Sequence, residues 1–448
     1  MNHGSTGGRR RLSVESHRDN VVSLVGPDWP RAEAVPLSQS LGRVLAADAA
    51  AGVDVPRFRN SAMDGFAIRW ADAARPLSIA LDLPAGVAAA RALGEGEAAR
   101  IMTGAPLPEG ADIVVPIEDC VVEGESVRFV STPRLGQHVR QAGEDVRHGK
   151  VVLTAGTRLA ARHLAAAAAV GAGDGDGFAA ARPDPQPDAG LGNGAPLGGG
   201  LWRGLAKAAA PPTAAGQLLV AVKPKVAVVA TGDELAAPGD RLGPASIYDS
   251  NGPYLTAAVA AAGGVVTLQA RCPDDPAALR RLLDQAAEAA DVILVSGGAS
   301  VGDHDVTRDV TGGEVEFVTV AMQPGKPQGW GRWRGRPLLA LPGNPVSVAV
   351  SFACFGRALL DAMLGAAPDP ARRSRVEAGW ESPAGRRQFM PVAVRVDATG
   401  ATLARPATPG GSGSHLVTAL ARADALAVVG EEVRRVEVGD VLTLVRLD

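Results

Sequence analysis

The stretch SGGASVGDHD, residues 296–305, combines residues that favour an anion with residues that repel one. Its glycines let backbone N–H groups approach phosphate oxygens, and its hydroxyl groups can donate hydrogen bonds as well. The residues that could bind an anion in this way are Ser296, Gly297, Gly298, Ser300 and Gly302. Its carboxylates, Asp303 and Asp305, fit the same loop if a hard cation lies between them and the anion.

Comparable residues follow the neighbouring apolar runs of the chain. TGDE at 231–234, DD at 274–275, PGKP at 324–327 and PGNP at 342–345 each follow such a run. Because ligands bind outside the carboxyl ends of parallel strands, we expect these residues on one rim of a sheet. The further ligand-binding residues expected there are Thr231, Gly232, Lys326, Pro342, Gly343, Asn344 and Pro345.

A divalent metal is also expected at this rim. The carboxylates Glu234, Asp274 and Asp305 could hold it, since Mg²⁺ usually takes one or two carboxylates together with substrate phosphates. Each motif alone has a simpler interpretation: SGG as a turn, His304 as an exposed side chain, and Lys326 as a surface residue. Their joint occurrence on consecutive strand ends favours a site for a phosphate-bearing ligand and a metal.

The region that carries these residues alternates strands and helices. Apolar runs at 225–230, 265–270 and 291–296 are separated by helical patterns at 251–264 and 276–290, an order that predicts a doubly wound parallel sheet. Short alternating strands on either side predict a small mostly β domain and a small β-barrel. The expected division is an N-terminal helical linker domain at 11–52 with 146–171, a β-rich domain at 53–145, a flexible low-complexity insertion at 172–221, the α/β domain at 222–368 and the C-terminal β-barrel at 369–448.

Composition and charge narrow the classes of function. The chain of 448 residues has a formal net charge of -3, so no basic excess indicates a nucleic-acid or membrane-surface partner. Cys120, Cys272 and Cys354 are far apart and form no CxxC pair, which favours a reducing cytoplasm. No apolar region follows the N-terminal arginines, so no signal peptide is expected. We expect a soluble cytoplasmic protein without a membrane span.

The motifs and their order resemble those of the MoeA/gephyrin E-domain family, the molybdopterin molybdenumtransferases. The resemblance covers nearly the whole chain outside the first ten residues and the insertion. It is carried by NSAMDGFAI at 60–68, RIMTGAPLPEGADIVV at 100–115, GEDV at 143–146, VAVVATGDEL at 226–235, IYDSNGPYL at 247–255, SGGASVGDHD at 296–305, PGKP at 324–327, LPGNPVS at 341–347 and GSGSHL at 411–416.

The resemblance implies a reaction, a molybdopterin-binding α/β domain and roles for particular residues. Such enzymes take adenylyl-molybdopterin and molybdate, release AMP with Mg²⁺ and form molybdenum cofactor. Their site is completed by the β-rich domain of the partner subunit in an elongated homodimer, and further partners would be the molybdopterin adenylyltransferase and molybdoenzymes. The implied roles are Asp64, Thr103 and Asp145 on the partner side, Glu234, Asp274 and Asp305 around metal and pyrophosphate, Pro342 and Pro345 around molybdate, and Ser414 from the C-terminal domain.

Three positions depart from the family pattern. Gln323 stands where the family has a lysine before PGKP, and Thr319 stands where some relatives have another. Arg59 replaces an acidic residue before NSAMDG. The first two changes reduce the positive charge expected near molybdate, so they bear on oxyanion affinity more than on the class of reaction.

Two alternative functions remain open at this point. A molybdopterin adenylyltransferase would share the α/β domain, but that class typically lacks the flanking domains and their motifs. A non-catalytic, gephyrin-like scaffold would need only its surface. The acidic residues retained in the motifs argue against a decayed site: they are Asp64, Asp145, Glu234, Asp274 and Asp305.

Overall fold

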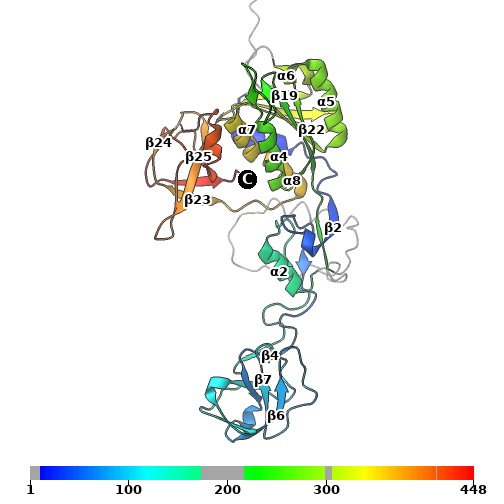
Figure 1. Ribbon diagram of the computed structural model, residues 1–448, viewed down its shortest axis with the longest axis vertical. Coiled ribbons are helices and arrows are strands. Elements are labelled where there is room, and N and C mark those ends of the chain that lie inside the picture. The colour runs from blue at the N-terminus through cyan, green and yellow to red at the C-terminus, as the bar shows by residue number, and fades with distance from the viewer. Residues whose placement is uncertain (1–10, 173–215, 298–304, 410, 448) are drawn as a thin grey trace, which may run out of the picture.

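The computed structural model describes residues 11–172, 216–297, 305–409 and 411–447. The candidate residues Gly298, Ser300, Gly302 and Asp303 lie outside the described residues, as do residues 173–215 of the predicted insertion. Figure 1 shows an elongated molecule with a β-rich domain at one end and a small domain in the middle. The α/β and C-terminal domains lie side by side at the other end.

The α/β domain is built on a seven-stranded sheet in the order β1-β19-β21-β22-β18-β14-β17. All neighbouring strands run parallel except β21, which is antiparallel to both β19 and β22. The predicted α/β domain is therefore confirmed, with one antiparallel strand added. The strands are β1 (Arg11–Leu12), β14 (Lys225–Thr231), β17 (Val265–Cys272), β18 (Val292–Ser296), β19 (Val315–Val320), β21 (Pro327–Trp333) and β22 (Arg336–Leu341).

Helices cover both faces of the sheet because its central strands are apolar on both sides. In β14, Val226 and Val228 pack into one buried cluster, while Ala227 and Val229 pack into another. Figure 1 shows α4 and α8 on one face and α5 on the other. The helices are α1 (Val14–Val22), α4 (Asn251–Ala261), α5 (Pro276–Ala289), α6 (Val306–Thr311), α7 (Pro345–Ser351), the π-helix η4 (Phe352–Gly356) and α8 (Arg357–Leu364).

The antiparallel strand β21 was not indicated by the sequence pattern. Its residues, QGWGRW after Pro327, alternate glycine with large side chains, and a β-carbon on Gly331 would lie 2.1 Å from the carbonyl oxygen of Glu314. A tight turn at Arg334 and Gly335, both with positive φ, connects β21 to β22. Positive φ at both central residues is what two-residue hairpin turns require.

The N-terminal segment packs on the α/β domain. The sequence pattern groups residues 11–52 with 146–171, but β1 pairs with β19 and α1 lies against α8 and η4. Leu12, Val14 and Val21 are buried in the same cluster as the sheet. Burial of this apolar face, rather than sequence proximity, decides where the segment docks.

One helical stretch is long and apolar enough to cross a membrane by length and composition, Pro345–Leu364. Of its 18-residue apolar window, 72% is buried inside the molecule. It forms the continuous run of α7, η4 and α8, which packs against the sheet and α1. Its apolar character is therefore accounted for by the core of the α/β domain.

The middle domain is assembled from three separated parts of the chain. Its core contains Val35 and Leu45, Leu153 and Leu159, and Leu218. The strand β13 (Gln217–Ala221) pairs with β2, and its apolar run LLVA is buried. The predicted insertion therefore ends before this strand and not at residue 221. The elements are β2 (Ala32–Pro36), β3 (Ala49–Ala50), β12 (Val151–Leu153), α2 (Ala161–Ala169) and β13 (Gln217–Ala221), with the 3-10 turn η1 (Leu37–Gln39).

The β-rich domain forms a six-stranded sheet in the order β8-β5-β7-β6-β10-β9. Separate apolar clusters lie on its two faces, with Ala67 and Ala99 in one and Phe66 and Ala98 in the other. The strands are β5 (Gly65–Ile68), β6 (Leu77–Leu83), β7 (Glu97–Ile101), β8 (Ile113–Pro116), β9 (Cys120–Glu123) and β10 (Ser126–Phe129), joined by the small pair β4 (Asn60–Ser61) and β11 (Val139–Arg140) and the turns η2 (Trp70–Asp72) and η3 (Ile117–Asp119).

The C-terminal domain is a closed five-stranded barrel, as predicted. Its order is β25-β26-β23-β29-β27, and β27 pairs back with β25 to close it. The short strand β20 (Met322–Gln323) of the α/β domain pairs with β25 and joins the two domains. The barrel elements are β23 (Arg372–Val376), β25 (Arg387–Val396), β26 (Thr402–Pro406), α9 (Val417–Leu420), β27 (Ala425–Val429) and β29 (Val441–Val445), with the pair β24 (Trp380–Glu381) and β28 (Arg435–Val436).

His17 makes the docking of α1 dependent on pH. Its ring is 1% exposed and packs edge-on against Phe355, and burial lowers its pKa to about 4 from 6.5. The unfolded chain therefore binds a proton near pH 6.5 that the folded chain takes up only near pH 4, so stability is lost as pH falls through this window. The full effect is about 3 kcal/mol.

We predict that His17→Leu removes this part of the pH dependence. Chemical denaturation at pH 7.5 and pH 4.5 should give a smaller difference in unfolding free energy for the variant than for the wild type. The control is His148→Leu, because His148 is exposed and lies in the connection to the β-rich domain. Equal pH dependence in all three proteins would contradict the assignment.

A candidate active site at the carboxyl ends of the parallel strands

Three parallel strands end side by side on the rim of the sheet. The register pairs Ala230 of β14 with Ser296 of β18, and Ser296 with Leu341 of β22. The residues that follow these positions lie around one cavity of about 810 Å³. It contains most of the rim residues that the sequence predicted: Thr231, Gly232, Glu234, Asp274, Gly297, Asp305, Lys326, Pro342, Gly343, Asn344 and Pro345.

The floor of the cavity depends on close backbone contacts. Gly297 has a φ of 91°, and a β-carbon there would lie 2.5 Å from the carbonyl oxygen of Thr231. Gly343 lies against it, since a β-carbon on Gly343 would be 3.7 Å from the Gly297 Cα. Ser296 is buried below this floor, and its hydroxyl has no hydrogen-bond partner among the described residues. Only glycine allows the chain to pass at position 297.

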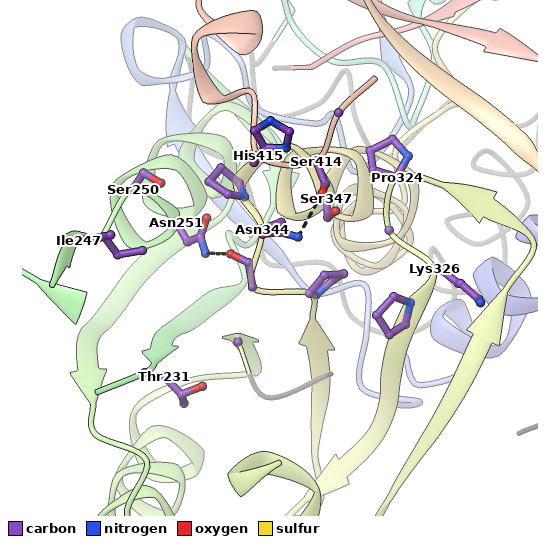
Figure 2. A pocket seen from close by; sticks show the side chains of 18 of the residues that line it. Thr231, Ile247, Ser250, Asn251, Pro324, Lys326, Asn344, Ser347, Ser414 and His415 are labelled. Atoms are coloured by element: carbon purple, nitrogen blue, oxygen red, sulfur yellow. Dashed lines mark hydrogen bonds between the residues drawn. The ribbon is translucent and has the colours of Figure 1, made fainter. Parts of the chain in front are cut away.

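The PGNP loop is held from two sides. Asn251, at the start of α4, donates from Nδ2 to the carbonyl oxygen of Gly343 at 2.7 Å. Asn344 donates from Nδ2 to the Ser414 Oγ at 3.1 Å, and the Val346 N–H donates to the Ser414 carbonyl oxygen at 3.1 Å. Figure 2 shows both side-chain contacts as dashed lines, one from Asn251 to the loop and one from Asn344 to Ser414. Ser414 therefore brings the C-terminal domain into the wall of the cavity.

The acidic residues lie at the other side of the rim. Burial raises the pKa of Asp274, and the negative charges of Asp233 and Glu234 raise it further. A hydrogen bond from the Asp233 backbone to the Asp274 carboxyl group opposes this shift. In the other direction, the Asp274 N–H donates to the Asp233 Oδ1 at 3.0 Å. The raised pKa marks a place where negative charge accumulates and where a cation would be favourable.

No three His, Cys, Asp or Glu side chains of the described residues are grouped closely enough to hold a metal by themselves. Glu234, Asp274 and Asp305 nevertheless fit a hard cation that takes one or two carboxylates and completes its shell with substrate phosphates. Asp305 also has a structural role, because its side chain caps α6 and accepts from the Arg308 N–H at 3.2 Å.

Positive charge reaches the cavity from two domains. Lys326, in the loop after β20, lines it and lies across the cavity from Ile247 in Figure 2. Arg386, directly before β25 of the barrel, also lines it and donates from Nη1 to the Gln323 Oε1 at 3.0 Å. Thr319 lies within β19, paired with Pro327, and is not part of the lining. Of the two departures from the family's lysines, only Gln323 therefore borders the cavity.

Several lining residues were not among the residues expected at the site, although most of them lie within or beside the quoted motifs. They belong to the first turn of α4, to β16 (Ile247–Tyr248), which pairs with β15 (Leu235–Ala236), and to the barrel. The polar side chains among them are Tyr248, Ser250, Asn251, Ser347, Arg386, Ser412 and His415. The polar residues in IYDSN and in GSGSHL were the signal in the sequence that could have identified these side chains. The GSGSHL segment reaches the rim only because the barrel docks there.

The three residues expected from the β-rich domain do not join the cavity within one chain. Asp64 accepts hydrogen bonds from the Thr103 N–H at 2.6 Å and from the Thr103 Oγ1 at 2.8 Å, and these bonds lower its pKa. Asp145 is exposed, and its N–H donates to the Val55 carbonyl oxygen at 2.9 Å. Arg59 donates from Nη2 to the Ala111 carbonyl oxygen at 3.3 Å. Figure 1 places this domain at the far end of the molecule from the cavity.

Family models match three consecutive parts of the chain. Residues 12–171 match the MoeA N-terminal region (domain I and II), residues 227–362 match a probable molybdopterin binding domain, and residues 373–447 match the MoeA C-terminal region (domain IV). The chain belongs to the MoeA family. The match to both flanking regions distinguishes it from the alternative of an adenylyltransferase that has the α/β domain alone.

Curated MoeA relatives support the same assignment. Molybdopterin molybdenumtransferase 2 of Mycobacterium tuberculosis is 38% identical over 447 residues, 95% of this chain and 97% of the relative. Molybdopterin molybdenumtransferase of a Nostoc species is 32% identical over 78% of this chain and 71% of its own length. These relatives are transferases, and the MoeA family membership assigns this chain a role in molybdenum cofactor biosynthesis.

The MoeA fold is also found in solved structures. A molybdopterin biosynthesis MoeA protein from Pyrococcus horikoshii superposes with a TM-score of 0.72 at 30% identity, covering 98% of this chain and 100% of the other. A second structure under that title, at 24% identity, has a TM-score of 0.74 with the same coverage and shows the likeness of fold.

We predict that Asn251→Asp destabilises this MoeA-family chain. At pH 8 the new carboxylate would face the Gly343 carbonyl oxygen, and two acceptors in contact at a buried position cost about 1–3 kcal/mol. The matched control is Asn344→Asp, because the Ser414 hydroxyl can rotate and donate to the new carboxylate. Thermal unfolding should show a drop of several degrees for Asn251→Asp alone. Equal melting temperatures would show that the 2.7 Å contact does not hold the loop.

Proposed function

We propose that the protein transfers molybdenum to adenylyl-molybdopterin, with Mg²⁺-dependent release of AMP to give molybdenum cofactor. The observation that carries the proposal is the single cavity of about 810 Å³ that joins carboxylates, hydroxyl and glycine donors, and two cationic side chains. This combination suits a nucleotide-linked substrate at the acidic side and an oxyanion at the cationic side. Incubation with adenylyl-molybdopterin, molybdate and Mg²⁺ should release AMP in step with cofactor formation.

The acidic side would hold Mg²⁺ and the pyrophosphate. Glu234, Asp274 and Asp305 are the residues that would hold the cation, which would polarise the phosphate oxygens. Thr231, Gly232 and Gly297 give the pyrophosphate a surface of hydroxyl and backbone groups. Gly298, Ser300, Gly302 and Asp303 are proposed to add to this surface from outside the described residues.

The cationic side would bind molybdate. Lys326 and Arg386 supply positive charge, and Pro342 and Pro345 give the PGNP loop its rigid shape. Ser414 presents a hydroxyl that already accepts from Asn344 and can therefore donate to an oxyanion. In this arrangement Arg386, which donates to Gln323, supplies the charge that the family's lysine supplies at position 323.

We further propose that a homodimer completes each site. Asp64, Thr103 and Asp145 would reach the cavity of the partner subunit, since they do not reach the cavity of their own chain. Exposed apolar side chains occur on both surfaces: Met63 and Met102 beside Asp64, 37% and 52% exposed, and Ile247 and Tyr248 at the cavity, 55% and 45% exposed. Burial of such side chains would favour the contact.

The remaining partners follow from the reaction. The molybdopterin adenylyltransferase would supply the adenylylated substrate, and molybdoenzymes would receive the product. Cys120, Cys272 and Cys354 are free thiols, which supports a cytoplasmic location. A non-catalytic scaffold would show no AMP release in the assay, whereas an adenylyltransferase would consume ATP.

We predict that the cation from Arg386 can be replaced from position 323. Arg386→Gln should raise the molybdate concentration needed for half-maximal rate about tenfold, because a cation near a partly buried dianion contributes ~1–2 kcal/mol. Adding Gln323→Lys to this variant should restore most of the loss. Initial rates over a molybdate series provide the measurement. Failure of the second substitution to restore affinity, with both proteins folded, would mean that Arg386 acts through its shape and not its charge.

We predict that two inactive variants complement each other. Asp64→Asn and Asp274→Asn should each be nearly inactive, and Asp274 is chosen over Asp305 because Asp305 also caps α6. In a mixed dimer one site carries both substitutions and the other carries neither, so random pairing should give about one quarter of the wild-type rate. Differently tagged chains establish that subunits exchange. If mixed dimers form but show no activity, either each site is built within one chain or Asp64 is not part of it.

A further inference from the structure

A buried hydrogen-bond relay runs from the barrel to the cavity. The Trp380 Nε1–H donates to the Gln388 Oε1 at 2.9 Å, and the Gln388 Nε2 donates to the Ser412 Oγ at 3.0 Å. Gln388 is 2% exposed and Ser412 is 8% exposed. Ser412 lines the cavity, whereas the other two residues lie behind it and line a smaller adjoining hollow of about 420 Å³.

The donors and acceptors of this relay can be arranged in only one way. An indole N–H is always a donor, so the amide of Gln388 must turn its oxygen toward Trp380. The amide nitrogen, which is always a donor, then faces Ser412. The Ser412 oxygen is thereby used as an acceptor, and its hydroxyl proton must point to another acceptor. No side chain or carbonyl group in the described parts of the chain accepts that proton.

This unpartnered hydroxyl hydrogen of Ser412 lies next to the cationic side of the cavity. Strand β20 pairs Gln323 directly with Gln388 of β25, so the relay lies next to the residue that accepts from Arg386. Gln323, Ser412 and Gly413 line both the cavity and the adjoining hollow. A hydroxyl group whose hydrogen has no acceptor among the described residues, on the same side of the cavity as a guanidinium group, favours an anionic oxygen over a cation.

We propose that Ser412 is an additional binding residue for the oxyanion substrate, and that Trp380 and Gln388 are positioning residues that orient its hydroxyl. This inference rests on the proposed function and deepens it. The bound group is an anionic oxygen, which could belong to molybdate or to the phosphate of AMP. The proximity to Arg386 assigns it to molybdate.

Binding of each anion alone to the full-length protein tests the assignment. Isothermal titration with molybdate and, separately, with AMP should show that Ser412→Ala weakens molybdate binding about tenfold, the loss expected for one hydrogen bond to a charged group. AMP binding should stay within about twofold. The matched control is Ser374→Ala, which removes another buried hydroxyl group of the barrel, bonded to the Thr402 carbonyl oxygen at 3.0 Å and outside the cavity lining.

The direction of the relay is tested by an isosteric change. In Gln388→Glu, one carboxylate oxygen can still accept from Trp380, and the other accepts the hydroxyl proton of Ser412, which turns it away from the cavity. Molybdate binding should fall at least as much as in Ser412→Ala. In the double variant the two losses should be less than additive, since both remove the same donor. Trp380→Phe, which frees the amide to rotate, should give a smaller loss in the same direction.

The outcomes separate the inference from the function on which it rests. If the wild type binds molybdate and a folded Ser412→Ala variant binds it with the same affinity, the inference is overturned and the proposed function stands. A loss of AMP affinity without a loss of molybdate affinity would overturn the assignment to molybdate. A wild-type protein that binds neither anion and releases no AMP from adenylyl-molybdopterin would overturn the proposed function and the inference together.

Discussion

The common register of three parallel strands is the constraint on which the site depends. Because Ala230, Ser296 and Leu341 lie side by side, the loops that follow them begin at the same level of the sheet. The loops then pass so close to one another that Gly297 accommodates no side chain beside Thr231. A shift of one strand by two residues would keep every buried side chain on its face but would separate the loops. The cavity floor is therefore a consequence of backbone pairing.

The second half of the cavity depends on how the barrel is attached. The pairing of β20 with β25 fixes Gln323 beside Gln388, and the contacts from Ser414 to Asn344 and Val346 fix the opposite side. These two attachments hold the hydroxyl groups of the barrel and one guanidinium group at the rim. The barrel thus acts as part of the site's scaffold. The carboxylates all come from the α/β domain, whereas the hydrogen-bond donors come from both domains, so the cationic side of the cavity exists only when the barrel is docked.

Much of the α/β domain could be predicted because the sequence patterns that define its strands and helices are local. Apolar runs followed by glycine and acidic residues identify strand ends, and a parallel topology brings those ends together without knowledge of any single contact. The strand β21 escaped prediction because its glycines are required by contacts with neighbouring strands: Gly331 meets the carbonyl group of Glu314, and Gly329 meets the side chains of Phe317 and Ala340. Arg386 and Ser412 escaped for a similar reason, since only the docking of two domains places them at the cavity. Side chains that depend on such long-range contacts carry no periodic signal.

The divided core of the middle domain has a consequence for synthesis on the ribosome. The β-rich domain is formed from one continuous stretch, β4 to β11, so all of its strands have been synthesised once residue 140 has been added. The middle domain must wait for β13, at 217–221, before Val35 and Leu45 can be covered. The strand β1 waits still longer, because its partner β19 begins at Val315. The strand β1 is therefore among the last elements to pair, and during synthesis the chain can carry a complete β-rich domain while β1 is still unpaired.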